Sequence, residues 1–171
     1  MKFYLVGYMY CGKTTVGKQL ARRLGLHFVD LDVAFESKYH IGIPAFFEQY
    51  GEEAFRKLEQ QMLHATADID GVVVSTGGGT ACYADNMEFI NSHGTSVYLR
   101  MDAETLARRA AVSHKPRPLL TLMDDDERRT HITAQLAQRA AYYERAAITV
   151  EADCDNPVKV ADRIIELSCM C

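Results

Sequence analysis

A glycine-rich segment near the start of the chain has the residues of a phosphate-binding loop. It reads Gly7-Tyr8-Met9-Tyr10-Cys11-Gly12-Lys13-Thr14, a full match to G-x-x-x-x-G-K-[ST] between an apolar run and a helical pattern. Gly7 and Gly12 permit backbone angles that other residues avoid, so that successive N–H groups turn around one anion. We expect Lys13 to contact the β- and γ-phosphates of ATP and Thr14 to coordinate Mg²⁺. The predicted nucleotide-binding residues of this segment are Gly7, Tyr8, Met9, Tyr10, Cys11, Gly12, Lys13, Thr14 and Thr15.

Two aspartates follow the second apolar run. Asp30 and Asp32 are separated by one residue, so their carboxylates point to the same side if the chain stays extended. That side is the carboxyl edge of a sheet, where open α/β folds bind their ligands. Because Asp32 also begins a helical pattern, a helix N-cap pair is the alternative interpretation.

An arginine stands beside the apolar face of a predicted helix. Arg56 is next to Phe55 and two residues before Leu58, so it can bend from that face toward a pocket. Glu59 and Gln60, three and four residues further on, lie on the same side and are placed to hold the guanidinium. The alternative is a solvent-exposed pair on the helix surface.

Three glycines and an irregular stretch complete the pattern. Gly77-Gly78-Gly79 follows the run 72–75 and leaves backbone N–H groups open to a close ligand, with a flexible loop as the alternative.

The stretch 112–126 contains Arg117 between two prolines and predicts a mobile lid. Arg117 can then stabilise the transferring phosphate, unless it is a solvent-exposed loop arginine.

Together these residues resemble the shikimate kinase family. The resemblance covers about residues 3 to 150, in the family's order and with near-family spacing. It implies an ATP-dependent kinase that phosphorylates the 3-hydroxyl of shikimate, giving shikimate 3-phosphate and ADP on the chorismate route to aromatic amino acids. It rests on Asp30-Leu31-Asp32, the segment from Gly51 to Glu59, Gly77-Gly78-Gly79, Arg117-Pro118-Leu119-Leu120, and Arg139 followed by Tyr143.

The resemblance implies that the two aspartates have different roles. Asp30 supports Mg²⁺ through water, which fits the lack of an acidic residue after strand 72–75, where many P-loop enzymes hold the metal. Asp32 holds the acceptor hydroxyls and takes the proton of the attacking one. We therefore expect Thr14 and Asp30 at the metal.

The resemblance also implies how the acceptor and the base are held. Two arginines grip the shikimate carboxylate, the glycine triplet lines the acceptor pocket, and Arg108 or Arg109 stacks on adenine. The predicted catalytic residues are Lys13, Asp32 and Arg117; the acceptor residues are Asp32, Arg56, Gly77, Gly78, Gly79 and Arg139; Arg109 and Arg117 join the nucleotide site.

The elements that must position these residues alternate between short β-rich runs and helical patterns. Such alternation predicts a five-stranded parallel sheet covered on both faces, a three-layer α/β/α P-loop fold like that of nucleoside monophosphate kinases. We expect one domain over 1–171, with an acceptor-binding region of about 31–62 and a lid of about 112–126. The predicted strands are 2–6, 27–30, 72–75, 95–99 and 147–150, and the helical stretches are 13–24, 32–67, 83–92, 102–111, 127–145 and 157–168.

The composition limits the kinds of partner that we expect this protein to bind. The 171 residues suffice for one core, and 19 Lys plus Arg against 23 Asp plus Glu give a net charge of −4, without a basic footprint for nucleic acid. The five cysteines are odd in number and suit a reducing cytosol, and no run approaches the ~20 apolar residues of a membrane helix. We expect a cytoplasmic monomer that binds ATP and shikimate, with Mg²⁺ and without nucleic acid or membrane partners.

Three other functions fit part of the pattern. A guanine-nucleotide switch would need N-K-x-D, which the sequence lacks. Gluconate kinase or a nucleoside monophosphate kinase would keep the phosphate loop and differ at the acceptor residues. A nucleotide-binding protein that has lost catalysis remains as a third alternative, against which Lys13, Asp32 and Arg117 argue.

Overall fold

The strands form one parallel sheet. The computed structural model describes residues 1–113, 120, 122–153 and 156–169. Its five strands pair in the order β2-β3-β1-β4-β5, all parallel, and each begins and ends within one residue of its predicted bounds. The elements are β1 (Lys2–Val6), α1 (Lys13–Leu24), β2 (His27–Asp30), α2 (Leu31–Tyr39), α3 (Ile43–Ala65), the 3₁₀ turn η1 (Thr66–Asp68), β3 (Val72–Ser75), η2 (Thr80–Cys82), α4 (Asn86–His93), β4 (Thr95–Arg100), α5 (Ala103–Ala111), α7 (Asp125–Tyr143), β5 (Ile148–Glu151) and α8 (Pro157–Ser168).

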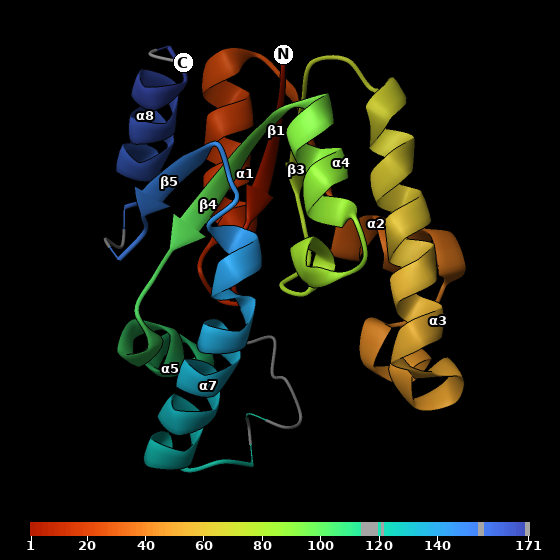
Figure 1. Cartoon of the computed structure of the whole chain (residues 1–171), viewed down its shortest axis with the longest axis vertical. Coiled ribbons are helices and arrows are strands. Elements are labelled where there is room, and N and C mark those ends of the chain that lie inside the picture. The colour runs from red at the N-terminus through yellow and green to blue at the C-terminus, as the bar shows by residue number, and fades with distance from the viewer. Residues whose placement is uncertain (114–119, 121, 154–155, 170–171) are drawn as a thin grey trace.

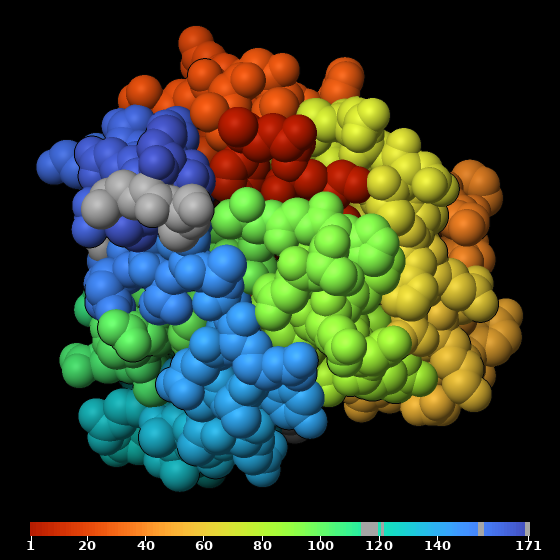
Figure 2. All heavy atoms as spheres, turned by 45° about the horizontal axis from the view of Figure 1, so that its top comes forward, coloured from red at the N-terminus to blue at the C-terminus, as the bar shows by residue number. Residues whose placement is uncertain are grey.

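Helices cover both faces of the sheet, which confirms the predicted three layers (Figure 1). Successive side chains of β1 point to opposite faces: Phe3 and Leu5 pack in the core beneath α1 and α8, and Tyr4 and Val6 in the core beneath α3 and α4. All four are at most 1% exposed. Figure 2 shows α4 in light green directly beside the yellow α3 and the blue end of α7.

The predicted helical stretch 32–67 consists of two helices and a 3₁₀ turn. The second helix, α3, is interrupted at Gly51, whose φ of 80° and ψ of 166° are closed to residues with a side chain. The break redirects the chain so that its second half carries Arg56 toward the sheet edge. A separate aromatic cluster ties α2 to both halves of α3, and its buried members are Phe35, Ile43, Phe46 and Phe55.

Two predicted helix starts were wrong. The helix predicted at 127–145 spans Asp125–Tyr143, because Asp124 and Glu127 form a reciprocal capping box of 2.8 and 3.0 Å. Asp125 and Asp126 therefore belong to α7 and not to the predicted lid. The helix predicted at 83–92 spans Asn86–His93 and is preceded by the turn η2.

The loops that follow β1 and β3 leave the sheet side by side. The Leu5 carbonyl accepts hydrogen bonds from both the backbone N–H of Thr76, at 3.2 Å, and its hydroxyl, at 2.9 Å. One strand further along, Asp30 at the end of β2 lies opposite Ser75 at the end of β3. The arrowheads in Figure 1 point toward the end of the molecule where α5 and α7 lie. This edge holds the predicted site residues.

Two expectations from composition can be compared with the described residues. Cys11, Cys82 and Cys169 are all free thiols. Within the same described part of the chain, no helix combines the length and apolar character needed to cross a bilayer.

Candidate active site

The phosphate loop encloses a lysine. Gly12, with a φ of 92°, ends the loop as the N-cap of α1, and Lys13 in the first turn is 8% exposed. The Lys13 ammonium donates to the Gly7 and Tyr8 carbonyls at 2.7 and 2.8 Å. Tyr8 and Cys11 turn their side chains into the core, each 1% exposed. The backbone of the loop and the positive end of α1 are therefore suited to an anion.

Asp30 performs two tasks with its two carboxylate oxygens. One accepts the Thr14 hydroxyl at 2.6 Å, and the other caps α2 by accepting the N–H groups of Asp32 and Val33 at 3.1 and 3.3 Å. The chain does not stay extended through Asp32, so the N-cap alternative holds for Asp30. The Asp30 carboxylate nevertheless lies beside the end of β3, where Ser75 offers no acidic group to a metal.

The phosphate loop and both aspartates line one cavity. It measures about 360 Å³ and brings together residues that are far apart in the sequence. The predicted phosphate, metal and acceptor residues Lys13, Thr14, Asp30, Asp32 and Gly78 all contribute to its wall.

A second cavity adjoins the other side of the phosphate loop. It measures about 190 Å³ and lies between Gly12, Arg109, Ala152 and Pro157. The Arg109 guanidinium donates to the Tyr10 carbonyl at 3.3 Å, which ties α5 to the loop. Of the two predicted candidates for contact with adenine, Arg109 lines this cavity.

Arg56 is held by a buried carboxylate. Its guanidinium donates to Glu59 at 2.7 Å, and Glu59 is 3% exposed. Burial lowers the pKa of Arg56, but the carboxylates of Glu59 and Glu52 outweigh burial and leave that pKa raised. Burial raises the pKa of Glu59, and Arg56 and the Thr80 hydroxyl offset part of that rise. The solvent-exposed alternative for Arg56 is therefore wrong.

Two partners in this cluster were missed from the sequence, and one was assigned wrongly. Glu52, one turn before Arg56, accepts from Nε and Nη2 at 3.2 Å each; testing residue i−4 as well as i+4 would have found it. Thr80 donates to Glu59 at 2.5 Å, but the end of α3, η1 and β3 separate the two residues in the chain, so no local signal exists for this contact. Gln60 does not hold the guanidinium and donates to Asp85 at 2.9 Å instead.

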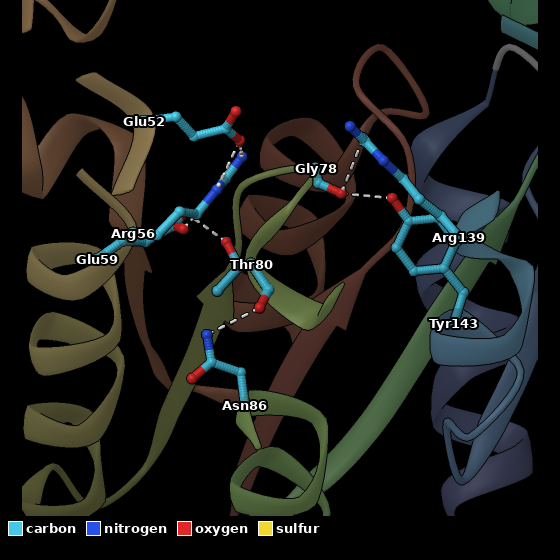
Figure 3. Close-up of polar contacts among 8 residues, drawn as sticks. All are labelled: Glu52, Arg56, Glu59, Gly78, Thr80, Asn86, Arg139 and Tyr143. Carbon is cyan, nitrogen blue, oxygen red and sulfur yellow. Dashed lines mark hydrogen bonds and ion pairs between the residues drawn. The ribbon is translucent and has the colours of Figure 1, made fainter. Parts of the chain in front are cut away.

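The glycine triplet lies between Arg56 and Arg139 (Figure 3). Arg139 donates to the Gly78 carbonyl at 3.3 Å, and the Tyr143 hydroxyl, one turn further along α7, donates to the same oxygen. On the opposite side, a Cβ on Gly79 would lie 2.3 Å from Nη2 of Arg56. Glycine at this position is what admits the guanidinium.

The two arginines border a small cavity that continues from the phosphate cavity. It measures about 50 Å³ and shares Met9, Asp32 and Gly78 with the larger one. Phe47 and Phe55 lie in its wall, and Phe55 also belongs to the cluster that packs α2 against α3. The remaining wall consists of Ile43, Arg56, Glu59, Gly77, Gly79 and Arg139.

One predicted catalytic residue cannot be placed. Arg117 and its flanking prolines lie outside the described residues, as do all of positions 114–119 and 121 of the predicted lid. The other predicted site residues are all described and gather around the two connected cavities or the adjoining loop.

Comparison with known proteins agrees with this geometry. The family model described as shikimate kinase matches residues 9–168. The chain belongs to the shikimate kinase family. The predicted family, the α/β fold and an ATP-dependent kinase activity on shikimate are thereby confirmed.

Three relatives illustrate how far the likeness extends. A shikimate kinase from Parabacteroides distasonis is 46% identical over 152 residues, 89% of this chain and 88% of the relative. The crystal structure of shikimate kinase from Bacteroides thetaiotaomicron superposes with a TM-score of 0.94 at 39% identity, covering 98% of each chain. The structure of the Acinetobacter baumannii enzyme in complex with shikimate superposes with a TM-score of 0.88 at 35% identity, covering 99% of this chain and 93% of that one.

We predict that Gly79→Ala weakens acceptor binding without unfolding the protein. The new Cβ would displace the guanidinium end of Arg56, and the Gly79 backbone, with φ −102°, accepts a side chain. The KM for shikimate should rise about tenfold, the KM for ATP should change less than twofold, and the melting temperature should fall little. Gly42→Ala is the control, because its Cβ meets nothing closer than 3.8 Å. Equal KM values in the two variants would contradict the assigned contact.

Proposed function

We propose that this chain transfers the γ-phosphate of Mg-ATP to the 3-hydroxyl of shikimate. The observation that carries the proposal is the shared wall of the two cavities, where Asp32 and Gly78 border both the phosphate loop and the arginine pair. A phosphate held at Lys13 and a hydroxyl held at Asp32 then face each other. Phosphoryl transfer depends mainly on such alignment and on charge stabilisation.

The acceptor is bound through charge and hydroxyl contacts. Arg56 and Arg139 enter from α3 and α7 on opposite sides of the glycine triplet, and planar guanidinium groups suit a carboxylate. Asp32 accepts hydrogen bonds from neighbouring hydroxyls and takes the proton of the attacking one as its bond to phosphorus forms. This set of groups suits a small anionic polyol.

The nucleotide is bound through the loop and the adjoining cavity. Backbone N–H groups of residues 7–15 surround the phosphates, and the Lys13 ammonium exchanges its two loop carbonyls for phosphate oxygens. Arg109 contacts the base at the 190 Å³ cavity. Arg117, from the predicted lid, supplies positive charge to the transferring phosphate.

The metal fits the oxygen atoms of Thr14 and Asp30. These atoms lie 2.6 Å apart beside Lys13, and hard oxygen ligands are those that Mg²⁺ prefers. The described residues contain no group of three or more metal-binding side chains, so water and phosphate must complete the coordination. Bound Mg²⁺ would neutralise charge on the β- and γ-phosphates. We also propose a cytoplasmic monomer.

A coupled assay of ADP release tests the function. Mg-ATP is supplied with shikimate, gluconate or nucleoside monophosphates in separate reactions, and shikimate 3-phosphate is identified by mass. Turnover is expected with shikimate alone. Turnover with gluconate in the absence of any with shikimate would overturn the proposal.

Arg139→Ala should weaken the acceptor far more than the nucleotide. Loss of a hydrogen bond to a charged group costs roughly 1.5–3 kcal/mol, which corresponds to about a 10- to 150-fold rise in the shikimate KM. The ATP KM should stay within about threefold. Arg129→Ala, an exposed arginine on the same helix, is the control. Equal increases in the KM values of shikimate and ATP would show that Arg139 does not belong to the acceptor site.

Asp30→Asn should separate the metal role from the cap role. Asparagine caps helices about as well as aspartate, so α2 and the melting temperature should persist. The Mg²⁺ concentration for half-maximal activity should rise at least fivefold, since a charged ligand partner is lost. Asp102→Asn is the matched control, because Asp102 caps α5 and lines neither the phosphate cavity nor the cavity at Arg109. An unchanged Mg²⁺ requirement would rule out a role for Asp30 in holding Mg²⁺ through water.

A further inference from the structure

A tyrosine that lines neither the phosphate cavity nor the small arginine cavity holds the glycine triplet in place. Tyr143 is 0% exposed, and its hydroxyl donates to the Gly78 carbonyl oxygen, which also accepts from Arg139 (Figure 3). The two donors stand four residues apart on α7. A single backbone oxygen of the glycine triplet is thus held by two side chains of one helix.

Fixing this carbonyl fixes the peptide that follows it. In a planar trans peptide the C=O and N–H groups point in opposite directions, and the described chain has no cis bond. Since the Gly78 carbonyl points to α7, the Gly79 N–H points away from α7, toward the side where Arg56 packs against Gly79. Glycine has little conformational preference of its own, so the contacts must set this orientation.

We propose that Tyr143 is a positioning residue for the acceptor, which it serves by aiming the Gly79 N–H into the cavity between Arg56 and Arg139. The inference rests on the proposed function, in which that cavity takes shikimate. The Gly79 N–H then donates to an oxygen of the acceptor, and Arg139 is held in place by sharing the same carbonyl.

The surroundings of Tyr143 suit this role. Its ring stacks on Tyr98 with centroids 5.1 Å apart and planes at 27°, so the hydroxyl has little freedom to move. Burial raises the pKa of the phenol, which keeps the hydroxyl protonated as a donor. On the α3 side, Glu59 accepts a hydrogen bond from Thr80, just after the triplet. The side-chain hydrogen bonds to the Gly78 carbonyl come from α7.

Tyr143→Phe tests the proposal, because it keeps the ring and removes only the hydroxyl. The dissociation constant and KM of shikimate should rise about three- to tenfold, while the KM of ATP should stay within twofold. A purely structural hydroxyl would lower stability without this split between the two substrates.

Tyr4→Phe is the matched control. Tyr4 is also 0% exposed, belongs to the same core cluster and loses a buried hydroxyl bond, to Thr66 at 2.9 Å, away from the site. It should lower the melting temperature comparably and leave both KM values unchanged. If Tyr143→Phe raises the shikimate KM no more than Tyr4→Phe, or raises both KM values equally, the proposal is wrong.

A measurement on the unaltered protein gives an independent test. In ¹⁵N-labelled protein the Gly79 amide signal should be among those that shift most when shikimate is added. An unshifted Gly79 amide under saturating shikimate would overturn the inference while leaving the kinase activity intact. Absence of shikimate turnover in the unaltered chain would contradict the proposed function itself, and this inference with it.

Discussion

The carbonyl oxygen of Leu5 accepts hydrogen bonds from both the backbone N–H and the hydroxyl of Thr76. The rest of the site depends on this junction between two loops. It joins the carboxyl ends of the neighbouring strands β1 and β3, from which the phosphate loop and the glycine triplet emerge. The chain leaves β1 toward β2 and leaves β3 toward β4, on opposite sides of the junction. Such a switch in direction opens a crevice at the sheet edge, where α/β proteins bind ligands. The topology of the sheet therefore places the phosphate loop, which would bind ATP, beside the glycine triplet, which would bind the phosphate acceptor.

The glycine triplet is held from both flanks, and burial decides which contacts matter. Arg56 and Glu59 form a shielded pair, with side chains 14% and 3% exposed, whereas pairs such as Arg163–Glu166 are more than half exposed. An exposed pair contributes about 0–1 kcal/mol, while removing one partner of a buried pair costs roughly 3–5 kcal/mol. Thr80 connects Glu59 to the triplet, and Asn86 donates to the Thr80 carbonyl at 2.8 Å. On the α7 flank, Arg139 and Tyr143 share one carbonyl.

Local features could be predicted from the sequence, whereas contacts between residues far apart in the chain could not. The apolar runs placed all five strands, and the phosphate loop was predicted because its glycines and lysine are adjacent in the chain. The helix starts predicted at residues 127 and 83 were wrong, because a cap and a turn place the actual starts at Asp125 and Asn86. Helical spacing named two partners for Arg56, of which Glu59 is confirmed and Gln60 is wrong. The contact between Thr80 and Glu59 spans 21 residues, and only the folded chain brings these two side chains together.

A crystal structure with shikimate, Mg²⁺ and an ATP analogue that resists transfer tests the central claim most directly. The claim predicts the shikimate carboxylate between the guanidinium groups of Arg56 and Arg139, and its 3-hydroxyl at Asp32, in line with the γ-phosphate above Lys13. A neighbouring cavity of about 420 Å³ shares Arg56, Gly79 and Arg139 with the small cavity but lacks Asp32, and its other lining residues are Glu52, Glu53, Cys82 and Tyr83. Shikimate bound there, with its hydroxyls turned away from Asp32, would contradict the claim.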